Sequence, residues 1–270
     1  PFWLKQAAQC REGPPQVPYA IDWMGLPTGW WAWPKLAMYE VLLDRFAAPS
    51  RAPCADRLDY CGGTFRAAGQ QLEYLKELGV DAVALSPVSE NMPHGYHGYW
   101  TKDLDRVNPR FGTEPDLAEL IFRAHLAGFK VWADVNVKHA GSPGMRPEDI
   151  SSLRPFNKPE YFRAGNCSMW AGPDVQHDAR RLERCMPYGM PDYKHEDPAV
   201  RQGLQQWLRR HVDKFGFDGI RVGGARHLPR DFMYNIPASG PPIPAFYEVP
   251  DGNMTNVASY SVTDYSAVYN

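Results

Sequence analysis

The segment QQLEYLKELGVDAVALSP, residues 70–87, contains one complete step from a helix to a strand. Leu72, Leu75 and Leu78 recur at the spacing of one helix face, and Gly79 marks the end of that helix. The run DAVALSP that follows is short and apolar, which is typical of a buried strand. The segment therefore predicts a helix followed by a strand, the repeating unit of an α/β protein.

The same alternation extends in both directions along the chain. Thr113 predicts the N-cap of a helix with Pro115 in its first turn, and Asp197-Pro198 predicts the start of another. Five further strands are predicted at 37–43, 130–137, 218–222, 243–249 and 266–270. Alternating strands and helices favour either an open doubly wound sheet or a (β/α)8 barrel, of which about six strands are present.

The pattern predicts four regions. Residues 140–190 are rich in proline, glycine and charge and are too long for an ordinary loop, so they predict a small inserted domain after strand three. The predicted regions are a tryptophan- and proline-rich arm at 1–36, barrel strands one to three at 37–139, the inserted domain at 140–190, and barrel strands four to six at 191–270.

Composition excludes several classes of function. The 270 residues are 44% hydrophobic and 22% charged, which suffices for a full core. A net charge of −2 gives no basic surface for nucleic acid or an anionic membrane. We find no apolar run of the roughly 18 residues that a membrane span needs. Because the chain starts at Pro1, we expect it to be a processed or partly observed product.

The cysteines and sequons favour the secretory pathway. Cys54 and Cys61 bracket one short loop, Cys167 and Cys185 bracket another, and Cys10 is left over. Two sequons, at Asn166 and Asn253, indicate glycosylation and an extracellular location. The alternative is five reduced thiols in a cytosolic protein.

Polar residues follow several of the predicted strands. In a barrel the chemistry lies at the C-terminal strand ends, so these residues are expected to converge on one mouth. They are Asp44, Arg45, Asp134, His139, Arg221 and Glu248. Five other histidines show no metal-ligand spacing and are expected at the surface or in caps: His94, His125, His177, His195 and His211. Asp103 and Asp105 are expected to be loop charges.

Eight motifs give the chain a resemblance to a known family. They are YEVLLDRFA, YCGGTF, LGVDAVALSPVSEN, GYHGYW, VWADVNVKHAG, MPDYKHEDPAVR, FDGIRVGGARH and YEVPDGN. In this order they resemble the α-amylase family of glycoside hydrolases, in particular the secreted fungal type, over most of residues 37–270. The resemblance implies a (β/α)8 barrel with a small domain inserted after strand three, and disulfides Cys54–Cys61 and Cys167–Cys185.

The resemblance also implies a retaining hydrolysis of α-1,4-glucans. That chemistry needs an aspartate nucleophile after strand four and a glutamic acid after strand five, about 5 Å apart. In FDGIRVGGARH the nucleophile position is Gly223, which has no side chain to attack with. Arg221 and Glu248 match the orienting arginine and the acid/base. The positions matched to the sugar subsite are His97, Tyr99, Trp100, His139, Arg226 and His227.

Each of these assignments has an alternative. An alternative for Glu248 is a leftover carboxylate paired with Arg221, because structural ion pairs also hold such groups. An alternative for Tyr99 and Trp100 is an ordinary core position, since large aromatic side chains are usually buried.

The resemblance implies a calcium ion between the barrel and the inserted domain. Lys138 stands where the family has an asparagine ligand, and a lysine ammonium does not coordinate calcium. The other positions matched to the site are Glu183, Asp192 and the carbonyl of His227. We predict a Lys138 salt bridge in place of the metal, and no cofactor.

Two functions follow from the sequence. The first is a degenerate amylase-like barrel that has lost hydrolysis and binds α-glucan or serves as a scaffold. The second is an α-amylase, or an inactivated variant or fragment of one. Six strands cannot close an eight-stranded barrel, so the sequence also predicts that a continuation of the chain or a protein partner covers the open edge.

Overall fold

The fold is taken from a computed structural model. It describes residues 36–50, 54–142, 147–163, 179–184, 190–236, 243–260 and 266–269. The predicted N-terminal arm, Cys10, Asn166, His177 and the pair Cys167 and Cys185 lie outside these ranges. Within them, no helix is long and apolar enough to cross a membrane.

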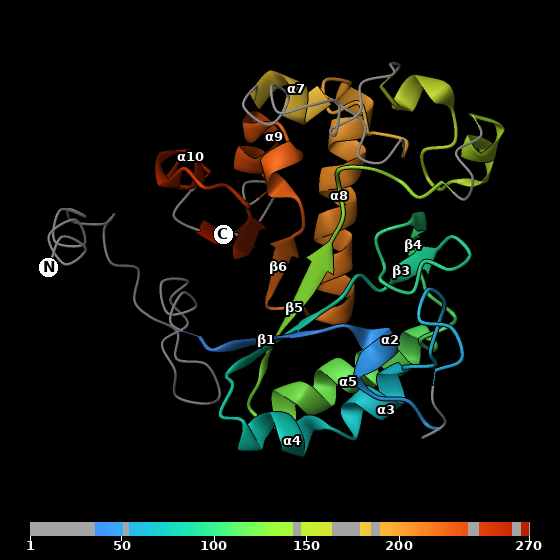
Figure 1. Ribbon diagram of the computed structural model, residues 1–270, viewed down its shortest axis with the longest axis vertical. Coiled ribbons are helices and arrows are strands. Elements are labelled where there is room, and N and C mark those ends of the chain that lie inside the picture. The colour runs from blue at the N-terminus through green and yellow to red at the C-terminus, as the bar shows by residue number, and fades with distance from the viewer. Residues whose placement is uncertain are drawn as a thin grey trace, which may run out of the picture. The chain divides into compact units, whose positions relative to one another are not determined.

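A single parallel sheet organises the described residues (Figure 1). Its strands are β1 Met38–Val41, β2 Ala82–Leu85, β5 Lys130–Val135, β6 Gly219–Val222, β7 Ala245–Glu248 and β8 Ser266–Tyr269. They lie side by side in chain order, and each pairs in parallel with the next. Six consecutive parallel strands with helical connections form part of a (β/α)8 barrel, as predicted.

Helices connect the strands. Their bounds are α2 Leu43–Phe46, α3 Phe65–Gly69, α4 Leu72–Glu77, α5 Glu114–Leu126, α7 Ala179–Arg184, α8 Pro198–Phe215, α9 Arg230–Asn235 and α10 Met254–Ala258. The capping signals in the sequence explain the two longest. Thr113 and Asp116 form a reciprocal capping box at the start of α5. Asp197 caps α8, which ends at Gly216 in a left-handed conformation with φ of 76°.

An antiparallel hairpin between β2 and α5 was not predicted. It consists of β3 Ser89–Asn91 and β4 Thr101–Val107. Asp103 and Asp105, predicted as loop charges, lie in β4 instead. The loop that joins the two strands, residues 92–100, carries three of the predicted sugar-binding residues, His97, Tyr99 and Trp100.

The described residues between β5 and α8 contain short elements. These are the 3-10 helices η2 Pro147–Ser152 and η3 Pro159–Tyr161, together with α7. Isolated bridges join His139 to Asp192 and Phe162 to Tyr193. The loop after β5 and the segment before α8 are therefore held side by side.

Two histidines were predicted at the surface and are buried. His195 is fully buried, and its Nε2–H donates to the Val137 carbonyl oxygen, 2.8 Å away. His211 lies on the buried face of α8 among Trp207, Phe215 and Phe217. The prediction was wrong because a neutral imidazole that is removed from solvent can pack like an aromatic ring.

Candidate functional site

The side chain of Arg221 is the centre of a polar cluster at the C-terminal ends of the strands. In β6 it lies beside Asp134 of β5, because the two residues are paired in the sheet register. Its Nη1 is 2.7 Å from Asp134 Oδ2, and Nε is 3.2 Å from Glu40 Oε1 of β1. Its Nη2 is 3.3 Å from Glu248 Oε1 at the end of β7. One guanidinium therefore faces three carboxylates.

Tyr99 joins the same cluster from the loop between β3 and β4. Its hydroxyl accepts from Arg221 Nη1 at 2.6 Å and donates to Asp134 Oδ2. Burial raises the pKa of Tyr99, and the Asp134 charge raises it further. Burial also raises the pKa of Asp134 to about 7, against the lowering effect of Arg221. The Arg221 charge and the Tyr99 hydrogen bond act against burial and favour the ionised carboxylate.

Gly223 lies in the turn that follows β6, next to this cluster. A Cβ atom at this position would lie 3.1 Å from Tyr99 Cε1 and 3.2 Å from Arg221 Nη1. Both distances are shorter than ordinary van der Waals contact, so even an alanine would require the tyrosine and the arginine to shift slightly. The position matched to the nucleophile therefore has no carboxylate, and the side chains of Tyr99 and Arg221 pack closely against it.

Glu248 faces hydrogen-bond donors with both oxygens. Oε1 meets Arg221 Nη2, and Oε2 accepts from the Gly224 backbone N–H at 2.9 Å. Gly224 adopts a left-handed φ of 61°, which aims this N–H at the carboxylate. Both contacts hold the carboxylate in place as a hydrogen-bond acceptor. The ion pair with Arg221 considered from the sequence is present.

An aromatic wall formed by His97, Tyr99 and Trp100 borders the cluster. The ring centroids of His97 and Tyr99 are 5.9 Å apart and stacked, and those of His97 and Trp100 are 4.9 Å apart and perpendicular. All three side chains are partly exposed, and Trp100 also packs against the hydrophobic core. Rings of this kind, with polar atoms at their edges, suit contact with a sugar.

Sequence reasoning missed two asparagines that hold the wall in place. Asn91 Oδ1 accepts from the Trp100 N–H at 2.7 Å, and Asn136 Nδ2 donates to the Tyr99 carbonyl at 3.0 Å. Both are buried polar residues at or beside the ends of strands. The signal that could have identified Asn136 is an amide side chain inside the apolar strand motif VWADVNV, because a buried amide needs hydrogen-bond partners.

His139, Arg226 and His227, the other positions matched to the sugar subsite, each make contacts of their own. His139 is buried, with Nδ1 3.1 Å from the Ala140 carbonyl, and burial lowers its pKa to about 4. Arg226 pairs with Asp251 at 3.2 Å and donates to the Pro250 carbonyl at 3.1 Å. Burial lowers the pKa of His227 to about 4.

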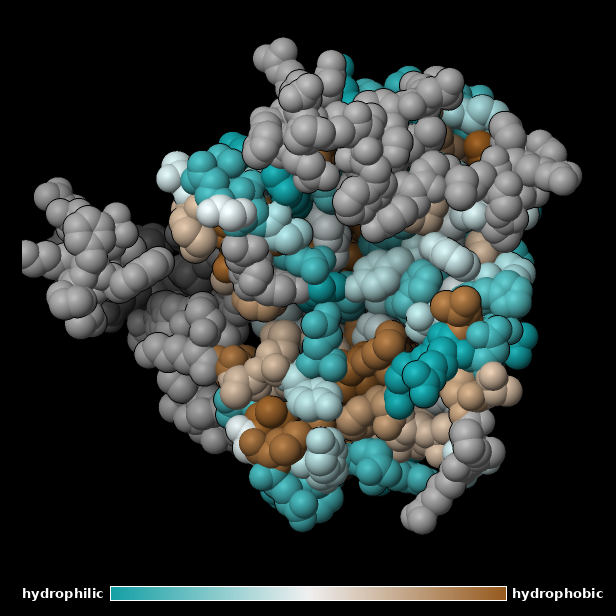
Figure 2. All heavy atoms as spheres, in the orientation of Figure 1, coloured by the Kyte–Doolittle hydropathy of each residue, from teal (hydrophilic) through white to brown (hydrophobic). Residues whose placement is uncertain are grey.

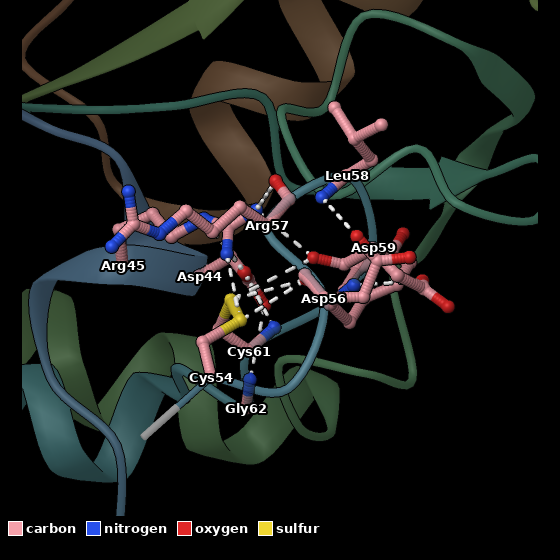
Figure 3. Close-up of a disulfide and its surroundings, with 10 residues drawn as sticks. Asp44, Arg45, Cys54, Asp56, Arg57, Leu58, Asp59, Cys61 and Gly62 are labelled. Carbon is pink, nitrogen blue, oxygen red and sulfur yellow. Dashed lines mark hydrogen bonds and ion pairs between the residues drawn. A yellow bond between two sulfur atoms is a disulfide. The ribbon is translucent and has the colours of Figure 1, made fainter.

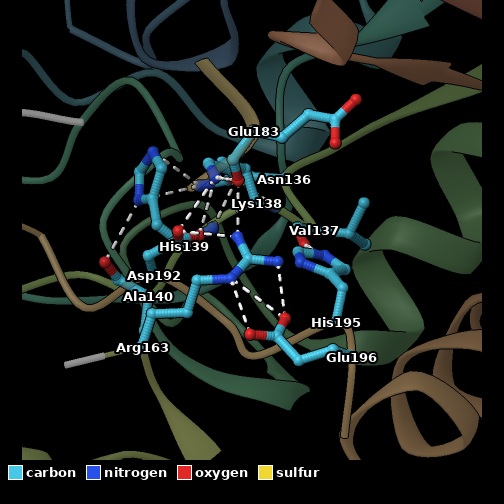
Figure 4. A network of polar contacts seen from close by, with 10 residues as sticks. All are labelled: Asn136, Val137, Lys138, His139, Ala140, Arg163, Glu183, Asp192, His195 and Glu196. Atoms are coloured by element: carbon cyan, nitrogen blue, oxygen red, sulfur yellow. Dashed lines mark hydrogen bonds and ion pairs between the residues drawn. The ribbon is translucent and has the colours of Figure 1, made fainter. Parts of the chain in front are cut away.

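The predicted Lys138 salt bridge is present (Figure 4). The Lys138 side chain is 3% exposed, and its Nζ lies 2.9 Å from Asp192 and 2.7 Å from the Glu183 carbonyl oxygen. The Arg163 guanidinium contacts the same Asp192 carboxylate at 2.9 Å. The Glu183 carboxylate points away from Lys138, so only its backbone carbonyl contributes (Figure 4).

These residues do not fit a calcium ion. Two cations occupy the Asp192 oxygens that would ligate it, and calcium prefers six to eight oxygen ligands. Burial lowers the pKa of Lys138 to about 8 and raises that of Asp192, while each charge favours the other. Among the described residues, no group of three or more His, Cys, Asp or Glu side chains suits a metal.

The predicted Cys54–Cys61 disulfide is formed (Figure 3). The predicted Cys167–Cys185 pair and the sequon at Asn166 fall outside the described residues and stay predictions. Asn253 is exposed and caps α10 by accepting from the Thr255 N–H at 2.9 Å. Its glycosylation also stays a prediction.

A partial barrel of parallel strands, with an arginine and carboxylates gathered at the strand ends, defines the class of (β/α)8-barrel domains with a polar site at the C-terminal strand ends. Comparison with known proteins narrows this class. The family model for the alpha amylase catalytic domain matches residues 40–242. The chain belongs to the alpha-amylase family.

Individual relatives support this assignment. The chain is 34% identical over 212 residues to alpha-amylase mde5 of Schizosaccharomyces pombe, which covers 74% of this chain and 40% of the relative. It is 33% identical to an alpha-amylase of Saccharomycopsis fibuligera, over 77% of this chain and 44% of that protein. The structure of an alpha-amylase from Malbranchea cinnamomea superposes with a TM-score of 0.77 at 30% identity, covering 86% of this chain and 51% of that one. The chain thus spans about half the length of these relatives.

Proposed function

We propose that this chain is a degenerate α-amylase domain that binds α-glucan without hydrolysing it. The observation that carries the proposal is Gly223, which leaves no carboxylate at the nucleophile position beside Arg221 and Glu248. Losing one member of a cooperating catalytic set typically lowers turnover by about 10⁴ to 10⁶. The partly exposed rings of the aromatic wall remain available for a sugar.

Calorimetric titration of maltoheptaose, together with a long incubation on starch, tests this proposal. We expect binding without release of reducing sugar. Trp100→Ala should abolish the binding signal, because it removes the largest ring of the wall. Tyr234→Ala removes an exposed aromatic side chain on α9 and serves as the control. Starch hydrolysis by the unmodified chain would establish the alternative, an active amylase, and contradict the proposal.

We also propose that the domain folds without calcium, with Lys138 in its place. The thermal unfolding midpoint should then be the same in a chelator as in millimolar calcium. Lys138→Met should lower the free energy of unfolding by about 3 kcal/mol, since it breaks a buried ion pair. Lys158→Met removes an exposed lysine and should have little effect. A midpoint that rises with calcium in the unmodified chain would contradict this prediction.

A further part of the proposal concerns the edges of the sheet. Within the described residues, β1 and β8 each pair with one neighbour only. A pocket of about 490 Å³ next to β1 is lined by Tyr39, Leu42, Phe46 and Tyr74, among others. Apolar side chains reach the surface near α2 and α4, where Leu42 and Leu78 are exposed (Figure 2). We propose that a continuation of the chain or a protein partner covers these edges.

The secretory location is part of the same proposal. The Cys54–Cys61 disulfide favours an oxidising compartment. The exposed sequon at Asn253 is compatible with glycosylation there.

A further inference from the structure

The loop closed by the Cys54–Cys61 disulfide is fixed onto α2 (Figure 3). The Asp44 carboxylate of α2 accepts from the Cys61 N–H at 2.8 Å and from the Gly62 N–H at 3.3 Å. A Cβ atom at Gly63 would lie 2.0 Å from the Leu43 carbonyl oxygen, so the two backbones touch. Residues 54–62, here called the disulfide loop, therefore have a fixed position relative to α2.

Arg45 connects this loop to the loop between β3 and β4. Its Nη2 donates to the carbonyl oxygens of Arg57 and Asp59, each at 2.9 Å, and Nη1 lies 3.3 Å from Cys54 Sγ. The same guanidinium lies 4.0 Å from the centroid of the Tyr96 ring. A planar guanidinium can bind two carbonyls at its edge and an aromatic ring on its face at the same time. Arg45 thus holds Tyr96 against the disulfide loop.

A second contact joins the same two loops. His94 Nδ1 lies 3.0 Å from Asp59 Oδ2. His94 has a φ of 65°, in the left-handed region that residues other than glycine rarely adopt. A conformation of this kind persists only where its surroundings hold it, and the Asp59 contact is one such restraint.

These contacts continue directly into the aromatic wall. The centroid of the Tyr96 ring is 5.2 Å from that of His97 in an edge-on arrangement. His97 in turn contacts Tyr99 and Trp100, and its Nδ1 accepts from the Tyr99 N–H at 3.0 Å. A displacement of Tyr96 would therefore act on the wall through His97.

We infer that Arg45, anchored by the disulfide loop, is a positioning residue that sets the aromatic wall for α-glucan. This inference rests on the glucan binding proposed above. Arg45 itself does not belong to the wall, and it acts through Tyr96 and His97. Breaking the Cys54–Cys61 bond would release the carbonyls that hold Arg45, so glucan affinity would depend on the oxidation state of this disulfide.

Two measurements on the purified chain test the inference. Hydrogen exchange of residues 94–100 reports the restraint itself, and titration with maltoheptaose reports its effect on binding. Arg45→Met and the double variant Cys54→Ser/Cys61→Ser should both speed exchange in residues 94–100 and raise the dissociation constant for maltoheptaose about tenfold. Arg45→Lys keeps the positive charge but loses the planar guanidinium, so its effects should lie between those of the unmodified chain and Arg45→Met.

Arg210→Met is the matched control, because it removes an arginine of α8 whose ion pair, with Asp105 of β4, is exposed. It should change neither measurement. Faster exchange in residues 94–100 of Arg45→Met, without maltoheptaose binding by the unmodified chain, would support the positioning role and refute the proposed function. Unchanged exchange in both Arg45→Met and the cysteine variant would overturn the inference, whatever the chain binds.

Discussion

Replacing Arg221 by methionine is expected to lower the free energy of unfolding by about 3–5 kcal/mol. The Arg221 side chain is 8% exposed and Asp134 is 1% exposed, so the variant leaves a buried carboxylate without its cation. Glu40 and Glu248 would lose the same partner. Urea unfolding followed by circular dichroism measures the change.

The companion variants separate lost charge from lost packing. Asp134→Asn keeps Arg221 paired with Glu40 and Glu248, so it should cost less than Arg221→Met. In the Asp134→Asn background, Arg221→Met should lower the free energy of unfolding much less than in the unmodified chain. The reason is that residue 134 then carries no charge that needs Arg221 as a partner. Equal costs of Arg221→Met in both backgrounds would show that the ion pair does not carry the stability.

The second large effect is expected on acidification. Burial lowers the pKa of His211 to about 4. Between pH 6.5 and 4 the unfolded chain binds a proton at this residue that the folded chain does not, so stability falls as the pH falls through this window. From pH 7 to pH 5 this one residue should account for a loss of about 2 kcal/mol. His211→Phe should therefore reduce the difference in stability between pH 7 and pH 5 by that amount.

The difference between variants is the test, because other groups also titrate in this range. Burial lowers the pKa values of His139 and His227 to about 4, and they act in the same direction as His211. Asp134 acts in the opposite direction, since its pKa is raised to about 7. Phe215→Leu alters the same aromatic cluster without removing a titratable group, and should lower stability equally at both pH values. An unchanged pH dependence in His211→Phe would contradict the assignment.

Local patterning predicted the six parallel strands and the longest helices. Their apolar faces repeat at the spacing of a strand or a helix, and Thr113, Asp197 and Gly216 mark helix ends in the sequence itself. The hairpin of β3 and β4 was not predicted, because its sequence lacks such a repeating apolar pattern. Its segments SEN and TKDLDRV contain too many polar residues to show the alternation of a half-buried strand. They form strands because they pair with each other.

The sequence by itself determined the identity of the groups at each position. It placed glycine at the nucleophile position and lysine among the positions matched to calcium, and it paired Cys54 with Cys61 through the resemblance to the amylases. These are properties of single residues within motifs, and they need no coordinates.

Only the tertiary structure decided which of these groups meet. The cluster around Arg221 joins four separate elements, and the link from Arg45 to the aromatic wall joins two loops that are distant in the sequence. The number of carboxylates that contact one guanidinium depends on the distances between elements. So does the burial that shifts a pKa. Such distances are set by packing across the whole domain, which no local pattern of residues encodes.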